Sequence, residues 1–439
     1  MLRELNGRTI LQLWGTPYDR GFAHGYLVGP QVVDFFVHFM LETVVASTVV
    51  YNKEVQPFLR KNFTFPVDLM NEATGIVAGM KAAGVPIYLS QLGREMDPFD
   101  ILAVNTYLEI EYFTYRGIDP TNQRKSPTPT TLPGGAQASK SACTQFVVWQ
   151  GETASGSLLA GRNMDGELDI FKVTVSHLLV FAIEPSLQHG ERKKLVNVMW
   201  PGFIGSLSGV NEDGIYSMMN YGSTGPGMLI RDTVPLPWTE KVVLVNTSLA
   251  EATPDQVLAK LNKFKSAAGG LCGTGCIVTY ARPYTPGNTP QQAPPAFFYE
   301  GDYSGGLMRL AGDTLFPFST TAIMASNHFI EYGVDPTTGP SFNFGEPVGL
   351  DSLWRYTAGA NAVDAFNRTG RHIDEDGMVR LLQTVAEGTT EHSILYIPST
   401  SNNNDHIIRI AAANMQPRAW DGPFMPWDTF KFGQLFLSH

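Results

Sequence analysis

The chain has 439 residues, of which 43% are hydrophobic and 16% are charged, and its formal net charge is −10. This length allows one large hydrophobic core or two domains, and the composition is that of a folded globular protein. Because nucleic acids are bound through a basic surface, the negative charge excludes them as expected partners.

The first third of the chain is predicted to be mostly helical after one strand at 8–13. Apolar residues recur at helical spacing in the segments 22–45, 67–83 and 101–113. No stretch reaches the roughly 18 uninterrupted apolar residues of a membrane span, and the richest one, 32–50, contains Asp34, His38 and Glu42. We therefore expect a soluble protein without a membrane partner, and the first residues lack the pattern of a signal peptide.

Residues 117–142 have the composition of a linker. They include four prolines and the pair Gly134-Gly135 among polar residues. Such a segment is expected to be exposed, so it could present the Ala142–Cys143 bond for cleavage, although a simple interdomain loop has the same composition. The predicted units are a helical N-terminal segment, 1–142, and a second unit, 143–439.

From Cys143 onward the hydrophobic pattern becomes that of short strands with turn residues between them. Helices are expected at 254–264, where Thr253 and Pro254 form a start signal, and at 363–367 and 377–386. The predicted strands are 143–150, 158–161, 171–183, 195–199, 206–210, 215–220, 277–280, 296–299, 307–311, 322–326, 394–397 and 407–411. This pattern predicts an α+β protein with two stacked antiparallel sheets covered by helices.

The most informative residue is Cys143, which begins a strand directly after the linker. A second strand, after the turn at 153–157, would bring Arg162 and Asp165 beside it. A guanidinium lowers the pKa of a thiol from its free value of about 8.5. If the bond before Cys143 were cleaved, its new α-amino group could act as a general base oriented by Asp165. Alternatively, Cys143 is a small buried hydrophobe beside an ordinary ion pair.

Several segments in this order resemble the N-terminal-nucleophile hydrolases. They are the run from Gly15 to Gly25, the Cys143 strand and the returning Gly161 to Asp165 strand. The chain is most similar to the isopenicillin N acyltransferase branch and more distantly to choloylglycine hydrolases and penicillin V acylases. The resemblance spans nearly the whole chain and implies a four-layer αββα sandwich, with the helical N-terminal segment packed on it.

The same resemblance implies roles for three further residues. Asn220 and Asn327 each end a predicted strand at positions where the family has groups that stabilise an oxyanion. Arg355 lies in a Ser-x-x-Arg-aromatic motif whose arginine approaches the catalytic centre, either near the thiolate or against a substrate carboxylate. The alternatives are a turn residue for Asn220 and an arginine stacked on Trp354 or Tyr356. His328 is interpreted as supporting rather than as a base.

Two departures from the family pattern concern the linker and the pocket. The linker before Cys143 is longer and looser than expected, which bears on the timing of cleavage. Met164 stands where relatives often have a bulkier residue, which bears on the substrate.

The other two cysteines, Cys272 and Cys276, lie four residues apart in a glycine-rich loop. They could form a disulfide, which would indicate an oxidising compartment such as the periplasm or the cell exterior, or they could be two free thiols. A second pair of metal ligands is missing nearby, so no metal is expected there. The compartment itself stays open.

The sequence thus predicts an enzyme that cleaves itself between Ala142 and Cys143 and whose two pieces stay associated. It would hydrolyse an amide bond of a small molecule, with an apolar acyl group, through a Cys143 thioester and without a cofactor. The catalytic set would be Cys143, Arg162, Asp165, Asn220, Asn327 and Arg355. The alternatives are an acyltransferase that uses an amine acceptor and a non-catalytic binding protein of the same fold.

Overall fold

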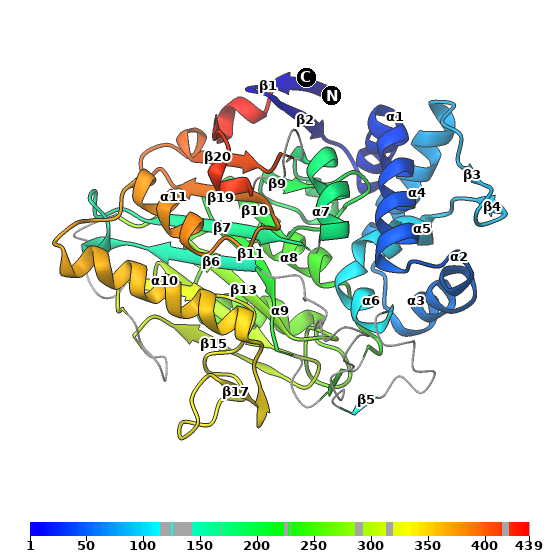
Figure 1. Ribbon diagram of the computed structural model, residues 1–439. Helices are drawn as coiled ribbons and strands as arrows, with labels where there is room; N and C mark the ends of the chain where they lie inside the picture. Colours follow the sequence, from blue (N-terminus) through cyan, green and yellow to red (C-terminus); the bar gives the residue numbers. More distant parts are fainter. Residues whose placement is uncertain are drawn as a thin grey trace.

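The structure is a computed structural model that describes residues 1–114, 124–125, 143–166, 168–223, 227–228, 230–285, 293–312, 319–414 and 421–438 (Figure 1). It has a mixed α+β architecture with two main sheets and a group of N-terminal helices. The expected α+β class is therefore confirmed.

The larger sheet has nine strands. In spatial order they are β1 (Leu2–Leu5), β2 (Arg8–Leu13), β8 (Leu179–Ile183), β9 (Leu195–Met199), β10 (Ser208–Asn211), β11 (Tyr216–Tyr221), β13 (Cys276–Ala281), β14 (Ala296–Gly301) and β15 (Gly306–Leu310). Its neighbouring strands are antiparallel except for β2 and β8, which are parallel. The N-terminal segment thus supplies two strands to this sheet as well as helices.

The smaller sheet has six antiparallel strands. In spatial order they are β16 (Ala322–Ala325), β6 (Cys143–Val148), β7 (Leu159–Asp165), β19 (Thr390–Ile397), β20 (Ile407–Ala412) and β21 (Asp428–Lys431). The described residues also form three two-stranded ribbons: β3 (Tyr88–Leu89) with β4 (Arg94–Glu95), β5 (Arg124–Lys125) with β12 (Gly227–Met228), and β17 (Phe342–Asn343) with β18 (Glu346–Pro347).

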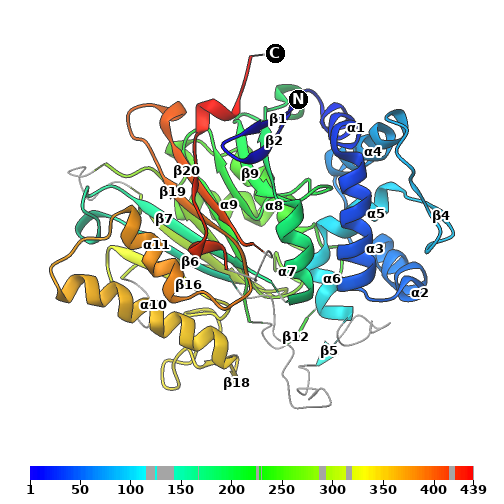
Figure 2. The same cartoon turned by 45° about the horizontal axis from the view of Figure 1, so that its top comes forward.

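The helices lie outside the two sheets (Figure 2). They are α1 (Pro17–Phe35), α2 (Thr48–Val50), α3 (Gln56–Asn62), α4 (Val67–Ala82), α5 (Pro98–Asn105), α6 (Tyr107–Thr114), α7 (Leu168–Thr174), α8 (Leu236–Val245), α9 (Pro254–Leu261), α10 (Leu350–Arg368) and α11 (Glu375–Thr384). Two π-helical segments, η1 (Phe36–Val44) and η2 (Tyr51–Val55), and several short 3-10 turns connect them: η3 (Gln150–Glu152), η4 (Val175–His177), η5 (Leu187–His189), η6 (Leu249–Glu251), η7 (Asn262–Phe264), η8 (Asn403–Asp405), η9 (Gly422–Phe424) and η10 (Phe432–Leu435).

Three hydrophobic clusters hold these layers together. One lies between the sheets and contains residues of both, such as Val198 and Ile394. Another joins the nine-stranded sheet to the N-terminal helices, and a third joins the six-stranded sheet to α10 and α11. Two sheets therefore pack face to face, and helices cover their outer faces.

Helices α1 and α4 approach each other unusually closely through glycines. A Cβ atom on Gly25 would lie 1.9 Å from the backbone oxygen of Ile76, and one on Gly79 would lie 2.0 Å from that of Phe22. No side chain fits in such a space, so glycine is required there. Two glycines of the 15–25 motif, Gly21 and Gly25, therefore serve helix packing.

A buried ionic network joins the N-terminal helices to the nine-stranded unit. Arg20 of α1 contacts Glu72 of α4 at 3.3 Å and also contacts Glu191, while Lys241 of α8 contacts Glu72 at 2.8 Å. All four residues are buried. Each charge has an opposite partner, as a buried charge requires.

The two ends of the described chain lie side by side (Figure 1). Arg3 donates to the Gln434 carbonyl at 2.8 Å. The side chain of Gln12 donates to the Leu437 carbonyl at 2.9 Å and accepts from the Leu437 N–H at 3.1 Å. The last residues are therefore fixed against β1 and β2.

The helical run Pro17–Val44 has the length and mean hydropathy, 1.2, of a membrane span, by composition alone. Half of its most apolar window is buried inside the protein. Phe35, Phe36 and Phe39 of this run belong to the core cluster. The sequence-based expectation of a buried helix in this region agrees with that packing.

One predicted strand, 171–183, is wrong over most of its length. Residues 168–174 form α7 and 175–177 form η4, so the strand begins only at Leu179. An apolar run of this length suits either a buried strand or a buried helix, and tertiary packing decides between them. The helix predicted at 363–367 also begins much earlier, at Leu350. Cys272 and Cys276 are joined as a disulfide, with their Cα atoms 6.1 Å apart.

Candidate active site

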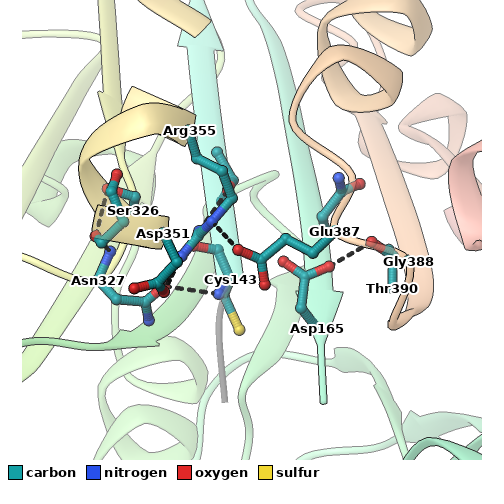
Figure 3. A network of polar contacts seen from close by, with 12 residues as sticks. Cys143, Asp165, Ser326, Asn327, Asp351, Arg355, Glu387, Gly388 and Thr390 are labelled. Atoms are coloured by element: carbon teal, nitrogen blue, oxygen red, sulfur yellow. Dashed lines mark hydrogen bonds and ion pairs between the residues drawn. The ribbon is translucent and has the colours of Figure 1, made fainter. Parts of the chain in front are cut away.

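The site lies at one end of the central hairpin of the six-stranded sheet. Cys143 is the first residue of β6 and pairs with Met164 of β7, so Asp165 extends one residue beyond this pair. Arg162 lies opposite Gln145 on the same hairpin. The register therefore brings Arg162 and Asp165 to Cys143 as the sequence predicts, and Figure 3 shows Asp165 beside the thiol.

Arg162 reaches across to the nine-stranded sheet. Its guanidinium donates to the carbonyl oxygens of Leu207 and Met219 and to the hydroxyl of Ser208. Its Nη2 atom lies 3.5 Å from the Cys143 sulfur. These contacts hold the buried, positively charged guanidinium of Arg162 next to the Cys143 thiol.

Two effects on the Cys143 thiol oppose each other. Burial raises its pKa above the usual value, because a buried thiolate loses its hydration. The Arg162 charge and hydrogen bond lower the pKa, whereas the Asp165 carboxylate raises it. In the uncleaved chain burial has the larger effect, so the thiol is mostly protonated at neutral pH.

Asp165 and Glu387 form an acidic pair beside the thiol. Asp165 is 1% exposed, and one of its oxygens accepts a hydrogen bond from Thr390. Its other oxygen has no hydrogen-bond partner within the described part of the chain. Burial and then the Glu387 carboxylate raise the pKa of Asp165 to about 8, against the lowering effect of Arg355. Burial also raises the pKa of Glu387.

Arg355 of α10 is fully buried and holds the first residue of β6. Its Nη1 atom donates to the Cys143 carbonyl at 2.9 Å, and its Nη2 atom donates to the Asn327 side-chain oxygen at 2.9 Å. It also pairs with Glu387 and, at 3.4 Å, with Asp351 (Figure 3). The arginine thus lies in the site, where it connects the nucleophile, an asparagine and the acidic pair.

The two asparagines occupy different places around Cys143. The side-chain oxygen of Asn327 accepts from the Cys143 N–H at 2.9 Å, and its amide nitrogen donates to the Tyr221 carbonyl. The Asn220 amide donates to the carbonyls of Cys143 and Ser326, at 3.0 and 2.9 Å. An amide group has two N–H donors, and both donors of Asn220 therefore hold backbone carbonyls at the start of β6 and after β16.

His328 contacts serines rather than the thiol. Its Nδ1 atom lies 2.7 Å from the Ser352 hydroxyl and 3.1 Å from that of Ser326. Burial lowers its pKa to about 3. The Ser352 hydroxyl also accepts from the Asn327 N–H, so His328 supports the loop that carries Asn327.

Sequence reasoning missed Glu387 because it lies between α11 and β19, outside any motif. Ala142, and with it the expected cleavage bond, lies outside the described residues. Within those residues, no group of three or more His, Cys, Asp or Glu side chains is arranged to hold a metal ion.

Comparisons with known proteins find distant similarities. No protein-family model matches the chain. An uncharacterised protein of Archaeoglobus fulgidus is 27% identical over 219 residues, which are 48% of this chain and 32% of that protein. The chain thus spans about a third of that relative's length.

Among solved structures, the chain is similar to a Caenorhabditis elegans ortholog of N-acylethanolamine-hydrolyzing acid amidase. The identity is 14%, the match covers 64% of this chain and 99% of that one, and the TM-score is 0.41. A mutant of the conjugated bile acid hydrolase from Clostridium perfringens is 13% identical. That match covers 66% of this chain and 96% of the hydrolase chain, and the TM-score is 0.37. We interpret the site from its own geometry.

Proposed function

We propose that this chain is an autoprocessing cysteine N-terminal-nucleophile enzyme with an αββα sandwich, which hydrolyses an amide bond of a small molecule. The observation that carries the proposal is the buried acidic pair beside Cys143, whose thiol is within reach of the Asp165 charge. The Asp165 carboxylate is buried and lies next to Glu387, and one of its oxygens has no partner among the residues that the structure describes. A free α-ammonium group on Cys143 would supply a charge and hydrogen-bond donors to this pair.

Self-cleavage would precede activity. The Cys143 thiol attacks the Ala142 carbonyl carbon, and the bond from that carbon to the Cys143 nitrogen breaks. The acyl group moves to sulfur and the nitrogen gains a proton. Water then hydrolyses the thioester, which releases the Ala142 carboxylate, the thiol and a new α-amino group on Cys143.

In the mature enzyme the α-amine would act as the general base. It takes the thiol proton while the sulfur attacks the substrate amide carbonyl, and Asn327 donates to the oxyanion. The proton then passes to the leaving amine as the carbon–nitrogen bond breaks. Water hydrolyses the thioester and releases the carboxylic acid. Arg162 would stabilise the thiolate, and Arg355 and Asn220 would hold the Cys143 backbone.

The decisive test is denaturing electrophoresis with intact mass and amino-terminal sequencing. Wild-type protein should run as pieces of residues 1–142 and 143–439, and the larger piece should begin at Cys143. The Cys143→Ala variant should remain whole and inactive. An intact wild-type chain with full activity would contradict the mechanism, as would a cut that persists in Cys143→Ala.

The acyl acceptor is a separate question. We propose that water is the acceptor. Analysis of the products with and without an added amine distinguishes hydrolysis from acyl transfer. Accumulation of a new amide in place of the free acid would identify an acyltransferase. A chain that stays uncleaved and unreactive toward thiol reagents would instead indicate a non-catalytic binding protein.

A further inference from the structure

A row of three side chains crosses the six-stranded sheet, starting at the thiol. Cys143 pairs with Met164 of β7, and Met164 pairs with His392 of β19. Directly opposed residues of neighbouring strands project to the same face of a sheet, and the Cys143 and Met164 sulfur atoms lie 3.8 Å apart. Neighbouring strands are about 4.8 Å apart, so the backbones of Cys143 and His392 are about 10 Å apart. An extended acyl chain of moderate length on Cys143 would span this distance if it ran alongside Met164.

Two polar side chains at the far end of the row lack hydrogen-bond partners in the described part of the chain. His392 is 1% exposed, and neither of its ring nitrogens has a hydrogen-bond partner among the described residues. Trp200, which follows β9, is also 1% exposed, and within the same residues its indole N–H has no partner. The two ring centroids are 6.2 Å apart, with the rings edge to face. Buried polar groups nearly always have partners, so these two adjoining side chains could both hydrogen-bond to one bound group.

The surroundings of Trp200 are aromatic. Its ring contacts Phe35, Phe39, Tyr107 and Phe203, at centroid distances of 5.9, 6.3, 6.5 and 5.3 Å. Most of these rings come from the N-terminal helices. They give this end of the row an apolar wall that suits the methylene groups of an acyl chain.

The ring nitrogens define which chemical group fits. Burial, followed by the nearby Arg162 charge, lowers the pKa of His392 to about 3, so its imidazole is neutral. A neutral imidazole has one N–H donor and one acceptor nitrogen, and the Trp200 indole has one donor. A hydroxyl group complements both, because it can donate to the imidazole while it accepts from the indole.

We propose that His392 and Trp200 form a polar subsite for a hydroxyl group on an otherwise apolar acyl chain attached to Cys143. This inference rests on the proposed amide hydrolysis and specifies its substrate class. His392 and Trp200 would determine specificity and take no part in bond cleavage.

The test compares anilides of hexanoic, octanoic and decanoic acid with anilides of the same acids that carry a terminal hydroxyl. For at least one length, wild-type kcat/KM should be about tenfold to a hundredfold higher for the hydroxylated anilide. His392→Leu should abolish this preference through a fall in kcat/KM for the hydroxylated anilide. His392→Gln should keep part of it, because an amide also donates and accepts.

Two further variants control for damage to the fold. Trp200→Phe keeps an aromatic ring but removes the indole N–H, so it should reduce the preference independently of His392. Leu395→Val alters an equally buried residue of the same strand that packs on the opposite face, in the α10 and α11 cluster, and should leave the preference unchanged.

Equal wild-type rates for plain and hydroxylated anilides at every length would overturn the proposal, and the pair would then hold only water. If no anilide is hydrolysed, the proposed function fails instead. The subsite is then tested by the rate at which chloromethyl ketones of the same chains alkylate Cys143, which requires no turnover. Equal alkylation rates for both chain types would again overturn it.

Discussion

At Cys143, burial and a neighbouring guanidinium act on the thiol in opposite directions. The balance depends on Arg162, whose position is fixed by carbonyl oxygens of another sheet. A substitution of Arg162 should therefore change the reactivity of the thiol while it leaves the surrounding structure largely unchanged.

We expect Arg162→Gln to raise the pH at which Cys143 reacts with iodoacetamide. The thiolate loses its neighbouring cation, so a greater share of the sulfur stays protonated. The measurement is the alkylation rate against pH, followed by intact mass. Arg162→Lys, which keeps a charge, should shift the profile less. Identical profiles for wild type and Arg162→Gln would make the arginine purely structural.

Asp165 should make the uncleaved precursor less stable as pH rises. Its pKa is 3.8 in its ordinary state and about 8 when folded, so the folded chain binds more protons than the unfolded one between these values. The contribution of Asp165 to the stability of the folded chain is therefore fully present below pH 3.8, and it is lost as the pH rises toward 8.

The prediction is tested in Cys143→Ala, which lacks the proposed nucleophile and should therefore stay whole. Its Tm should fall as pH rises through this range, and the double variant Cys143→Ala, Asp165→Asn should show a smaller fall. Equal slopes would assign the pH dependence to other groups.

At the scale of elements, the hairpin β6–β7 was predictable because turn residues separate two strand-forming runs. Its register then fixed the neighbours of Cys143. The position of Arg355 beside the Cys143 carbonyl was not predictable from local pattern, since α10 approaches from more than two hundred residues away. The same holds for Glu387, which becomes part of the site only when β19 pairs with β7.

The close approach of α1 and α4 gives an element-scale prediction. Gly25→Ala should destabilise the protein by about 1–3 kcal/mol, because its methyl group would overlap the Ile76 carbonyl and force the helices apart. Alanine has the higher helix propensity by about 1 kcal/mol, so helix formation alone predicts the opposite sign. The measurement is thermal or denaturant unfolding.

Gly151→Ala is the matched control, since a Cβ atom there meets nothing within 4 Å. It should change stability little. A Gly25→Ala protein as stable as wild type would show that α1 and α4 can move apart without a loss of folding stability.

At the scale of the whole molecule, the N-terminal segment is bound to the rest in two ways. Its strands β1 and β2 complete the nine-stranded sheet, and Arg20 and Glu72 enter a buried network with Glu191 and Lys241. A cut after Ala142 leaves both connections intact. The proposed pieces should therefore elute together under native conditions.

The adjacency of Arg3 to Gln434, and of Gln12 to Leu437, means that the chain could be opened elsewhere without disturbing the fold. A circularly permuted gene could encode Met, then residues 143–439, a short Gly/Ser linker and residues 1–142. Removal of the initiator methionine would make Cys143 the amino-terminal residue of the newly synthesised chain. This permutant should hydrolyse amides without any self-cleavage, as intact mass and turnover would show. A folded but inactive permutant would contradict the role of the free amine.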